Sequence, residues 1–298
     1  MASKIIVIGS ANADYVIHTD KMPELGETLV GHSFQVNAGG KGLNQAIAVA
    51  KMGGDVSFIG CVGDDSGADM LLGELERNGV AFDGIRADGV STGSAVIAVV
   101  RGDNFIIINP GANAMMTPEV IEKYADAIRD SEYCIMQLEI PMESVMKVCE
   151  IARESGTKVV LNPAPYKELP RELFTYVDYM IPNEFEAKDI TGIYPDTEEN
   201  CRAAVLKLTG MGVKTAIITL GERGSVYNVG DDVRFCPAVK ATAVDTTSAG
   251  DTFVGAVVSK LSAGIPLDDA IKFAAKACAI TVSREGASKS IPLASEIE

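Results

Sequence analysis

Short apolar runs alternate with longer segments of helical periodicity along most of the chain. The apolar runs, most of them bounded by Gly, Asn or Pro as buried strands are, cover residues 4–8, 56–59, 134–138, 158–161, 179–181 and 216–220. Helical patterns between them cover residues 66–77, 142–154 and 200–211. This alternation predicts an α/β fold, with a mostly parallel central sheet and helices on both of its faces.

Two stretches, residues 15–34 and 93–108, depart from this alternation. Both are rich in β-branched residues, and the second alternates at Ala95, Ile97 and Val99 and contains a Gly102-Asp103 turn. They indicate hairpin-like strands with no helix of their own. We expect them to form a small flap beside the main sheet; the alternative is that they are edge strands of that sheet.

The last third of the chain contains two strong helical patterns. The first begins near Gly250 and ends at Ala263, where Gly264 and Pro266 stop it. The second covers residues 267–281, and its apolar face consists of Ala270, Ile271, Ala274, Ala277 and Cys278.

The composition is that of an ordinary globular protein, with 298 residues, 47% of them hydrophobic and 22% charged. Lys and Arg number 26 against 41 Asp and Glu, so the formal net charge is 26 − 41 = −15. This balance argues against nucleic acid or an anionic membrane surface as a partner, because both require clustered cations. The sequence also has no apolar run of about 18 residues and no signal-peptide core, so we expect a cytoplasmic protein without a membrane segment.

Few residues are available to bind zinc. The only histidines are His18 and His32, and the six cysteines, at positions 61, 134, 149, 201, 236 and 278, are at least 15 positions apart, with no C-x-x-C pair. We therefore expect reduced, mostly buried thiols and neither a zinc site nor a disulfide framework.

Three matches to common motifs fail on their context. Residues 89–93 fit G-x-S-x-G, but both histidines precede Ser91, whereas the hydrolase triad needs a histidine after the serine. In the P-loop-like run that begins at Gly39, Gly42 takes the place of the Ser or Thr that binds Mg²⁺. Gly221 and Gly224 form no complete dinucleotide-binding motif.

The segment 244–256 is more informative. Small residues at positions 248–250 precede an apolar helix, so the first N–H groups of that helix are unobstructed and form an anion site. Asp251 lies in the first turn. Its carboxylate is either a plain partner of the helix dipole or a base placed to take a proton from a hydroxyl that attacks a phosphoryl group.

Two motifs together carry a family resemblance. Residues 245–251 read Asp-Thr-x-x-Ala-Gly-Asp, and residues 39–46 read Gly-Gly-Lys-Gly-Leu-Asn-Gln-Ala and are followed by a Gly-Cys-Val-Gly-Asp-Asp run at residues 60–65. On these motifs the chain resembles the ribokinase-like, or phosphofructokinase-B, family of carbohydrate kinases from about residue 4 to residue 292. The resemblance implies a three-layer α/β/α sandwich in one domain, 1–298, with a β-strand lid formed by residues 13–35 and 93–108.

The resemblance also implies an active site that transfers the γ-phosphate of ATP. Asp251 matches the catalytic base, and the backbone amides of Ala249, Gly250 and Asp251 match the anion hole. The sugar contacts match Asn12, Ala13, Asp14, Gly40, Lys41, Gly42, Leu43, Asn44 and Glu139. These positions favour phosphorylation of D-ribose at O5, because a cluster of Asn, Asp and Glu suits several hydroxyls. Deoxyribose, fructose and adenosine remain alternatives, as does a catalytically silent sugar-binding protein.

Cofactor sites follow from the same resemblance. Asn183 and Glu186 match the motif that handles Mg²⁺ and the phosphates, and the nucleotide contacts match Thr219, Leu220, Gly221, Glu222, Arg223 and Gly224. Ala275 stands near the adenine, where the family often has His or Asn. A site for K⁺ or another monovalent cation matches Asp245, Thr247, Thr281, Arg284, Gly286 and Ser290, mostly through backbone oxygens. The resemblance further implies a homodimer formed through the lid.

Overall fold

The computed structural model describes residues 4–100 and 103–297. Its centre is a nine-stranded sheet in the order β15-β14-β13-β12-β11-β10-β1-β4-β6. The strands are β1 (Ile5–Ile8), β4 (Val56–Ile59), β6 (Ala81–Phe82), β10 (Tyr133–Met136), β11 (Lys158–Leu161), β12 (Tyr179–Met180), β13 (Thr215–Thr219), β14 (Ser225–Val229) and β15 (Asp232–Cys236). All pairs are parallel except β13/β14 and β14/β15. The six predicted strands are confirmed within two residues at each end.

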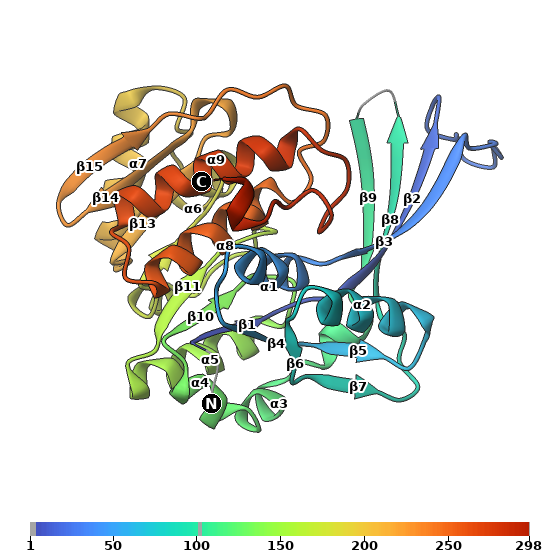
Figure 1. Cartoon of the computed structure of the whole chain (residues 1–298), viewed down its shortest axis with the longest axis horizontal. Helices are drawn as coiled ribbons and strands as arrows, with labels where there is room; N and C mark the ends of the chain where they lie inside the picture. Colours follow the sequence, from blue (N-terminus) through green and yellow to red (C-terminus); the bar gives the residue numbers. More distant parts are fainter. Residues whose placement is uncertain (1–3, 101–102, 298) are drawn as a thin grey trace.

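Helices cover both faces of this sheet, as Figure 1 shows. One face is covered by α1 (Lys41–Lys51), α2 (Ser66–Arg77), α8 (Ala249–Ser262) and α9 (Leu267–Val282). The other is covered by α3 (Pro118–Glu122), α4 (Ala125–Asp130), α5 (Met142–Ser155), α6 (Glu184–Thr191) and α7 (Glu198–Met211). In β1, Ile5 and Val7 pack on the first set, and Ile6 and Ile8 on the second. Burial on both faces explains why the strands are continuous apolar runs.

A second sheet of four strands extends from the edge of the sandwich (Figure 1). It consists of β2 (Asn12–Thr19), β3 (Ser33–Gly39), β8 (Gly93–Val100) and β9 (Asp103–Asn109), in the order β3-β2-β8-β9. Its strands are not edge strands of the main sheet. The strand β3 ends five residues beyond the predicted stretch. The prediction stopped short because Asn37, Ala38 and Gly39 carry no β-strand pattern in the sequence. The predicted turn at Gly102 lies outside the described residues.

The order of the strands predicts a ligand site at one edge of the sheet. From β1 the chain proceeds to β4 on one side, and it later returns to β10 on the other side of β1. In open α/β sheets, ligands bind where the strand order reverses in this way, beyond the carboxyl ends of the strands. The segments that follow β1, β10, β11 and β12 are therefore expected to meet there.

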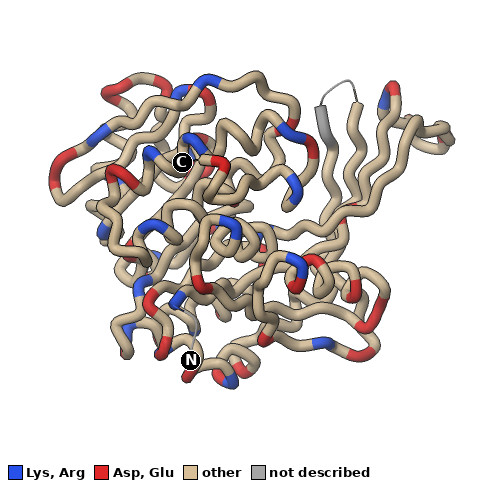
Figure 2. Tube along the Cα trace, in the orientation of Figure 1, with Lys and Arg blue, Asp and Glu red and all other residues tan. Residues whose placement is uncertain are grey.

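Close packing of α1 on α8 fixes the position of both helices at this edge. A Cβ added to Gly255 of α8 would lie 2.4 Å from the Cβ of Ala48 in α1. Charges are scattered over the surface, with Lys and Arg interspersed among Asp and Glu (Figure 2). Within residues 4–100 and 103–297, no helix is long and apolar enough to span a membrane.

Candidate active site

The N-terminus of α8 is shaped to bind an anion. Ser248 caps it in a left-handed conformation, with φ of 61°, and a Cβ added to Gly250 would meet open space. The first N–H groups of a helix have no partners within the helix, and the helix dipole makes this end electropositive. The amides of Gly250 and Asp251 therefore face an accessible region, whereas that of Ala249 makes a long turn contact to the Thr246 carbonyl, 3.3 Å.

Asp251 lies in the first turn of α8 and is only 7% exposed. Its Oδ1 accepts a hydrogen bond from Gln45 Nε2 at 2.9 Å, and its Oδ2 accepts one from Asn44 Nδ2 at 3.3 Å. Burial raises the pKa of the Asp251 carboxyl, while the charge of Lys41 and the two amide donors act to lower it. Asn44 Oδ1 has no hydrogen-bond partner among the described residues, so it can accept from a ligand hydroxyl.

Two glycines bring the start of α1 against the turn that follows β1. A Cβ on Gly42 would lie 2.6 Å from the Ser10 nitrogen, and one on Gly40 would lie 2.8 Å from the Ala11 Cα. Gly40 also has φ of 91°, which favours glycine. These contacts place the first N–H groups of α1 beside the carboxyl end of β1.

Glu139 lies at this helix terminus. Its Oε2 accepts hydrogen bonds from Ser10 Oγ at 2.5 Å and from the Lys41 amide at 3.1 Å. The predicted residues Ala13 and Leu43, by contrast, are buried in the core, at 1% and 0% exposure. The Leu43 amide donates to the Ser10 carbonyl at 2.9 Å, so it is also occupied within the protein.

Asn12 and Asp14 lie at the root of the four-stranded sheet. Asn12 Oδ1 accepts from Asn113 Nδ2 at 2.7 Å, which leaves the Asn12 amide nitrogen to donate elsewhere. Burial, followed by the charges of Glu139 and Asp251, raises the pKa of Asp14 to about 7. Hydroxyl groups of a ligand that donate to this carboxyl would favour its ionised form, so ligand binding would release its proton.

Lys41 is surrounded by carboxylates. Burial alone would lower its pKa, but the charges of Asp251, Glu139 and Glu186 raise the pKa above its ordinary value. The structure thus gathers the predicted sugar residues from three segments and Asp251 from a fourth, with three acidic groups around one lysine.

The predicted Mg²⁺ motif also has a structural role. Asn183 Oδ1 caps α6 by accepting from the amides of Phe185 and Glu186, both at 2.9 Å, and Glu186 Oε2 accepts from the Asn183 amide at 2.8 Å. This is a complete capping box. It leaves each side chain with spare acceptor capacity, which suits a Mg²⁺ ion that keeps several of its waters.

The predicted nucleotide segment lies beside this motif, because Asn183 and Thr219 form a parallel bridge. Leu220 follows, and residues Gly221–Arg223 form a short 3₁₀ turn. In that turn Glu222 is exposed, and the Arg223 guanidinium contacts Glu184 at 3.2 Å. Gly224 closes the turn at φ of 95°, where a Cβ would lie 2.0 Å from the Cys236 carbonyl oxygen.

A cavity of about 730 Å³ lies between α9 and the segment that leads to α8. It is lined by Val239, Lys240, Ala241, Thr242, Val244, Lys276, Ala279, Ile280, Ser283, Glu296 and Ile297. Ala279 stands one helical turn beyond Ala275, so the cavity lies farther along α9 than the predicted adenine contact. No motif in residues 239–244 indicated it.

The predicted cation residues gather around Asp245. Its Oδ1 accepts from the Thr247 amide at 2.9 Å, and its Oδ2 accepts from the Gly286 amide at 3.0 Å. Three other predicted side chains turn elsewhere: Thr281 contacts Thr252, Arg284 pairs with Glu296, and Ser290 contacts the Ala287 carbonyl. The Thr281 carbonyl accepts from the Arg284 amide at 3.1 Å, which leaves it a second lone pair, and backbone oxygens suit a hard cation. Within the described part of the chain, no group of three or more His, Cys, Asp or Glu residues could hold a metal ion.

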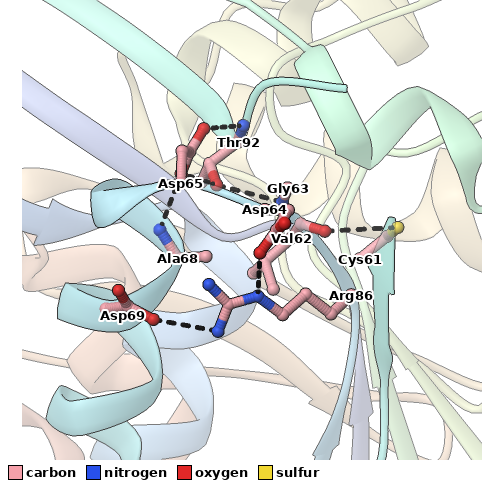
Figure 3. Close-up of polar contacts among 9 residues, drawn as sticks. All are labelled: Cys61, Val62, Gly63, Asp64, Asp65, Ala68, Asp69, Arg86 and Thr92. Carbon is pink, nitrogen blue, oxygen red and sulfur yellow. Dashed lines mark hydrogen bonds and ion pairs between the residues drawn. The ribbon is translucent and has the colours of Figure 1, made fainter. Parts of the chain in front are cut away.

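The root of the four-stranded sheet is fixed by Asp65, as Figure 3 shows. Asp65 Oδ1 caps α2 by accepting from the Ala68 amide at 2.9 Å and also accepts from Thr92 Oγ1 at 2.6 Å, while its Oδ2 accepts from the Thr92 amide at 2.7 Å. Thr92 Oγ1 in turn accepts from the Gly63 amide at 3.0 Å. Because Thr92 directly precedes β8, these bonds join the sheet to the sandwich.

Several of these residues were given no role by the sequence. Gln45 belongs to the 39–46 motif and Asp65 to the 60–65 run, but neither motif says what the side chain contacts. Thr92 and Asn113 are single polar residues far in the sequence from those they contact, and so is Gln137, whose Nε2 donates to Gln45 Oε1 at 2.6 Å. Only their burial, between 0% and 4% exposure, marks them as unusual for their type.

Comparison with known proteins identifies the family. Residues 2–294 match the pfkB family of carbohydrate kinases. The chain is 42% identical to the ribokinase of Schizosaccharomyces pombe, over 99% of this chain and 96% of the other, and 35% identical to the deoxyribokinase of Salmonella typhimurium, over 97% and 95%. The structure of Arabidopsis thaliana ribokinase complexed with ribose and ATP matches with a TM-score of 0.94 at 33% identity, over 100% of this chain and 98% of the other.

The resemblance found in the two sequence motifs is thus confirmed along the whole chain, together with the mostly parallel α/β sandwich that it implied. The chain belongs to the pfkB family of carbohydrate kinases.

Proposed function

We propose that this protein is a ribokinase, which transfers the γ-phosphate of ATP to O5 of D-ribose. The observation that carries the proposal is the Asp251 carboxylate, held at the bare N-terminus of α8 beside the buried side chains of Asn12 and Asn44 and the half-buried Asp14 and Glu139. The full-length similarity to ribokinases from several organisms supports it.

Asp251 is the general base in this proposal. It accepts the proton of the O5 hydroxyl while O5 forms a bond to the γ-phosphorus and the bond from phosphorus to the β,γ-bridging oxygen breaks, which yields ribose 5-phosphate and ADP. The N–H groups at the start of α8 stabilise the charge on the transferring phosphoryl group. The acidic chain therefore needs no basic surface patch to bind ATP.

The sugar is held by Asn12, Asp14, Lys41, Asn44 and Glu139. The amide nitrogen of Asn12, which makes no hydrogen bond within the described part of the chain, supports ribose over deoxyribose, because it can donate to the 2-hydroxyl. Deoxyribose remains the second candidate, since a deoxyribokinase is 35% identical to this chain.

The nucleotide lies along the segment 219–224 and extends toward the cavity of about 730 Å³ beside α9. Asn183 and Glu186 hold Mg²⁺ through water, using the acceptor capacity that the capping box leaves free. When bound, Mg²⁺ supplies neutralisation of the phosphate charge. Backbone oxygens around Asp245, Thr247 and Gly286 hold a monovalent cation such as K⁺, close to the start of α8.

The four-stranded sheet is the lid of the site, and closing it excludes water as a competing phosphoryl acceptor. We assign the lid to the same single domain as the sandwich, because Asp65 and Thr92 bind it directly to the core. A reducing compartment such as the cytoplasm suits the six cysteines, all of which are free thiols.

The outer face of the lid forms a homodimer interface in this proposal. The strand register places Val36, Tyr15, Val96 and Ile107 side by side in one row, and Phe34, Ile17, Ala98 and Phe105 in the next. Side chains directly opposite one another in a sheet share a face. All of these except Ala98 are at least 37% exposed. An apolar surface of this extent is typical of an interface.

Substrate specificity is tested with purified protein and ATP against ribose, deoxyribose, fructose and adenosine. We expect the highest kcat/KM for ribose. We also expect Asp251→Asn to lower kcat for ribose by about 10²–10⁴-fold, because the base is lost while sugar binding is retained. A higher kcat/KM for another of these compounds would contradict the assignment of ribose as the substrate. No turnover of any sugar would favour a silent binding protein, and unchanged turnover in Asp251→Asn would exclude the assigned base.

Sugar binding near pH 7 is expected to release up to one proton. Asp14 is partly protonated there, and hydroxyl donors favour its ionised form and so lower its pKa. Affinity for ribose should therefore fall as the pH drops below 7, by at most about tenfold per pH unit. Calorimetry in two buffers of different ionisation enthalpy measures the release. Asp14→Asn should lose it while Asp130→Asn, at an exposed position, keeps it; equal release by both variants contradicts the assignment.

The monovalent-cation site is tested by replacing K⁺ with tetramethylammonium at constant ionic strength. We expect a lower rate and a lower melting temperature without K⁺, because the carbonyl oxygens around Asp245 then lack their counter-charge. Asp245→Asn should remove both differences. A rate and a melting temperature that do not respond to K⁺ would refute this site.

The dimer is tested by sedimentation velocity. We expect Ile107→Lys, at a side chain that is 73% exposed, to give a monomer, because a charge is then buried in an apolar interface. Leu206→Lys on α7 makes the same kind of change on a different surface and should remain a dimer. A wild-type protein that sediments as a monomer at micromolar concentration would disprove the lid interface.

A further inference from the structure

A chain of buried amide side chains leads from the central sheet to Asp251. Gln137, which directly follows β10, donates from Nε2 to Gln45 Oε1 at 2.6 Å, and Gln45 Nε2 donates to Asp251 Oδ1 at 2.9 Å. Gln45 and Gln137 are both 0% exposed. Two fully buried glutamines at the end of a sheet are rare enough to need a reason.

The neighbours of Gln45 fix which end of its amide faces Asp251. Its nitrogen also donates to Asn162 Oδ1 at 3.1 Å, and Asn162 keeps that oxygen toward Gln45 because its own nitrogen donates to the Ile181 carbonyl at 2.9 Å. If the Gln45 amide were turned over, its oxygen would face two other oxygens and its nitrogen would face the nitrogen of Gln137. The observed orientation is therefore fixed from both ends.

This orientation has a cost at the far end of the chain of amides. Gln137 Oε1 is buried and has no hydrogen-bond partner among the described residues. It lies against Gly9, where an added Cβ would come within 2.1 Å of it. A buried amide oxygen without a hydrogen-bond partner is destabilising, so its persistence indicates that the opposite end of the amide is needed where it is.

We propose that Gln45, held by Gln137, is a positioning residue that keeps the Asp251 carboxylate oriented and in its deprotonated, acceptor-only state. The proposal rests on the proposed function of Asp251 as the base. The Gln45 amide is a neutral donor, so it can hold the carboxylate without itself attracting the ATP phosphates, as a second cation beside Lys41 would. Neither glutamine touches the sugar or the nucleotide in this assignment.

The test compares the pH dependence of kcat in the wild type, Gln45→Met and Gln45→Glu. Without the amide donor, Asp251 holds its proton more tightly, so the acid limb of kcat should move to higher pH, by about one unit in Gln45→Met. Gln45→Glu, which preserves the shape of the side chain, should move it further, because two carboxyls then share a proton. The KM for sugar should change less than about twofold, because Gln45 makes no sugar contact. Gln137→Met should shift the limb in the same direction by less, and Gln35→Met, at an exposed glutamine of β3, should leave it unchanged.

A second measurement does not depend on turnover. The ¹³C carboxyl resonance of Asp251, identified by its loss in Asp251→Asn, should titrate at higher pH in Gln45→Met and Gln45→Glu than in the wild type. An unchanged titration in both variants overturns the role of Gln45. If the wild type phosphorylates no sugar but the resonance shifts as expected, the positioning role stands and the proposed function fails instead.

Discussion

The site is organised around one negative charge that must be kept out of water and yet remain charged. Burial of Asp251 opposes its ionisation, and the two other acidic groups nearby, Asp14 and Glu139, oppose it further. Lys41, two amide donors and the positive end of α8 act in the other direction. Most features of this edge of the sheet supply one of these contributions. The glycines at positions 40 and 42 bring α1 against the turn after β1, from which Asn44 and Gln45 bond the carboxylate, and Gly255 lets α8 pack directly on α1.

The sequence predicts those parts of the structure in which residues adjacent in the chain have the same degree of burial. The central strands are buried on both faces, so runs such as residues 56–59 are recognisable without any tertiary information. The start of α8 is equally local, since a bare turn followed by an acid lies within four residues. Packing decides the elements that are missed, such as the end of β3 and the short helices α3 and α4.

The site shows the same limit. Asp251 and Lys41 could be found because each lies in a contiguous motif, whereas Gln137, Asn113 and Thr92 are isolated and gain their roles only when distant segments meet. The run from Asn183 to Glu186 shows a further difficulty. Its spacing suits a helix cap and a metal motif equally well, and the structure shows the complete cap.

The cradle at the start of α8 has a consequence for how this fold evolves. Its donors are backbone N–H groups, so they persist through almost any side-chain replacement, whereas the proposed base is a single carboxylate. The product of a duplicated gene that lost Asp251 would keep the backbone donors that bind a phosphate and lose only the proposed capacity to transfer it. One substitution thus separates a catalyst from a nucleotide sensor, and the scaffold supplies both without being rebuilt.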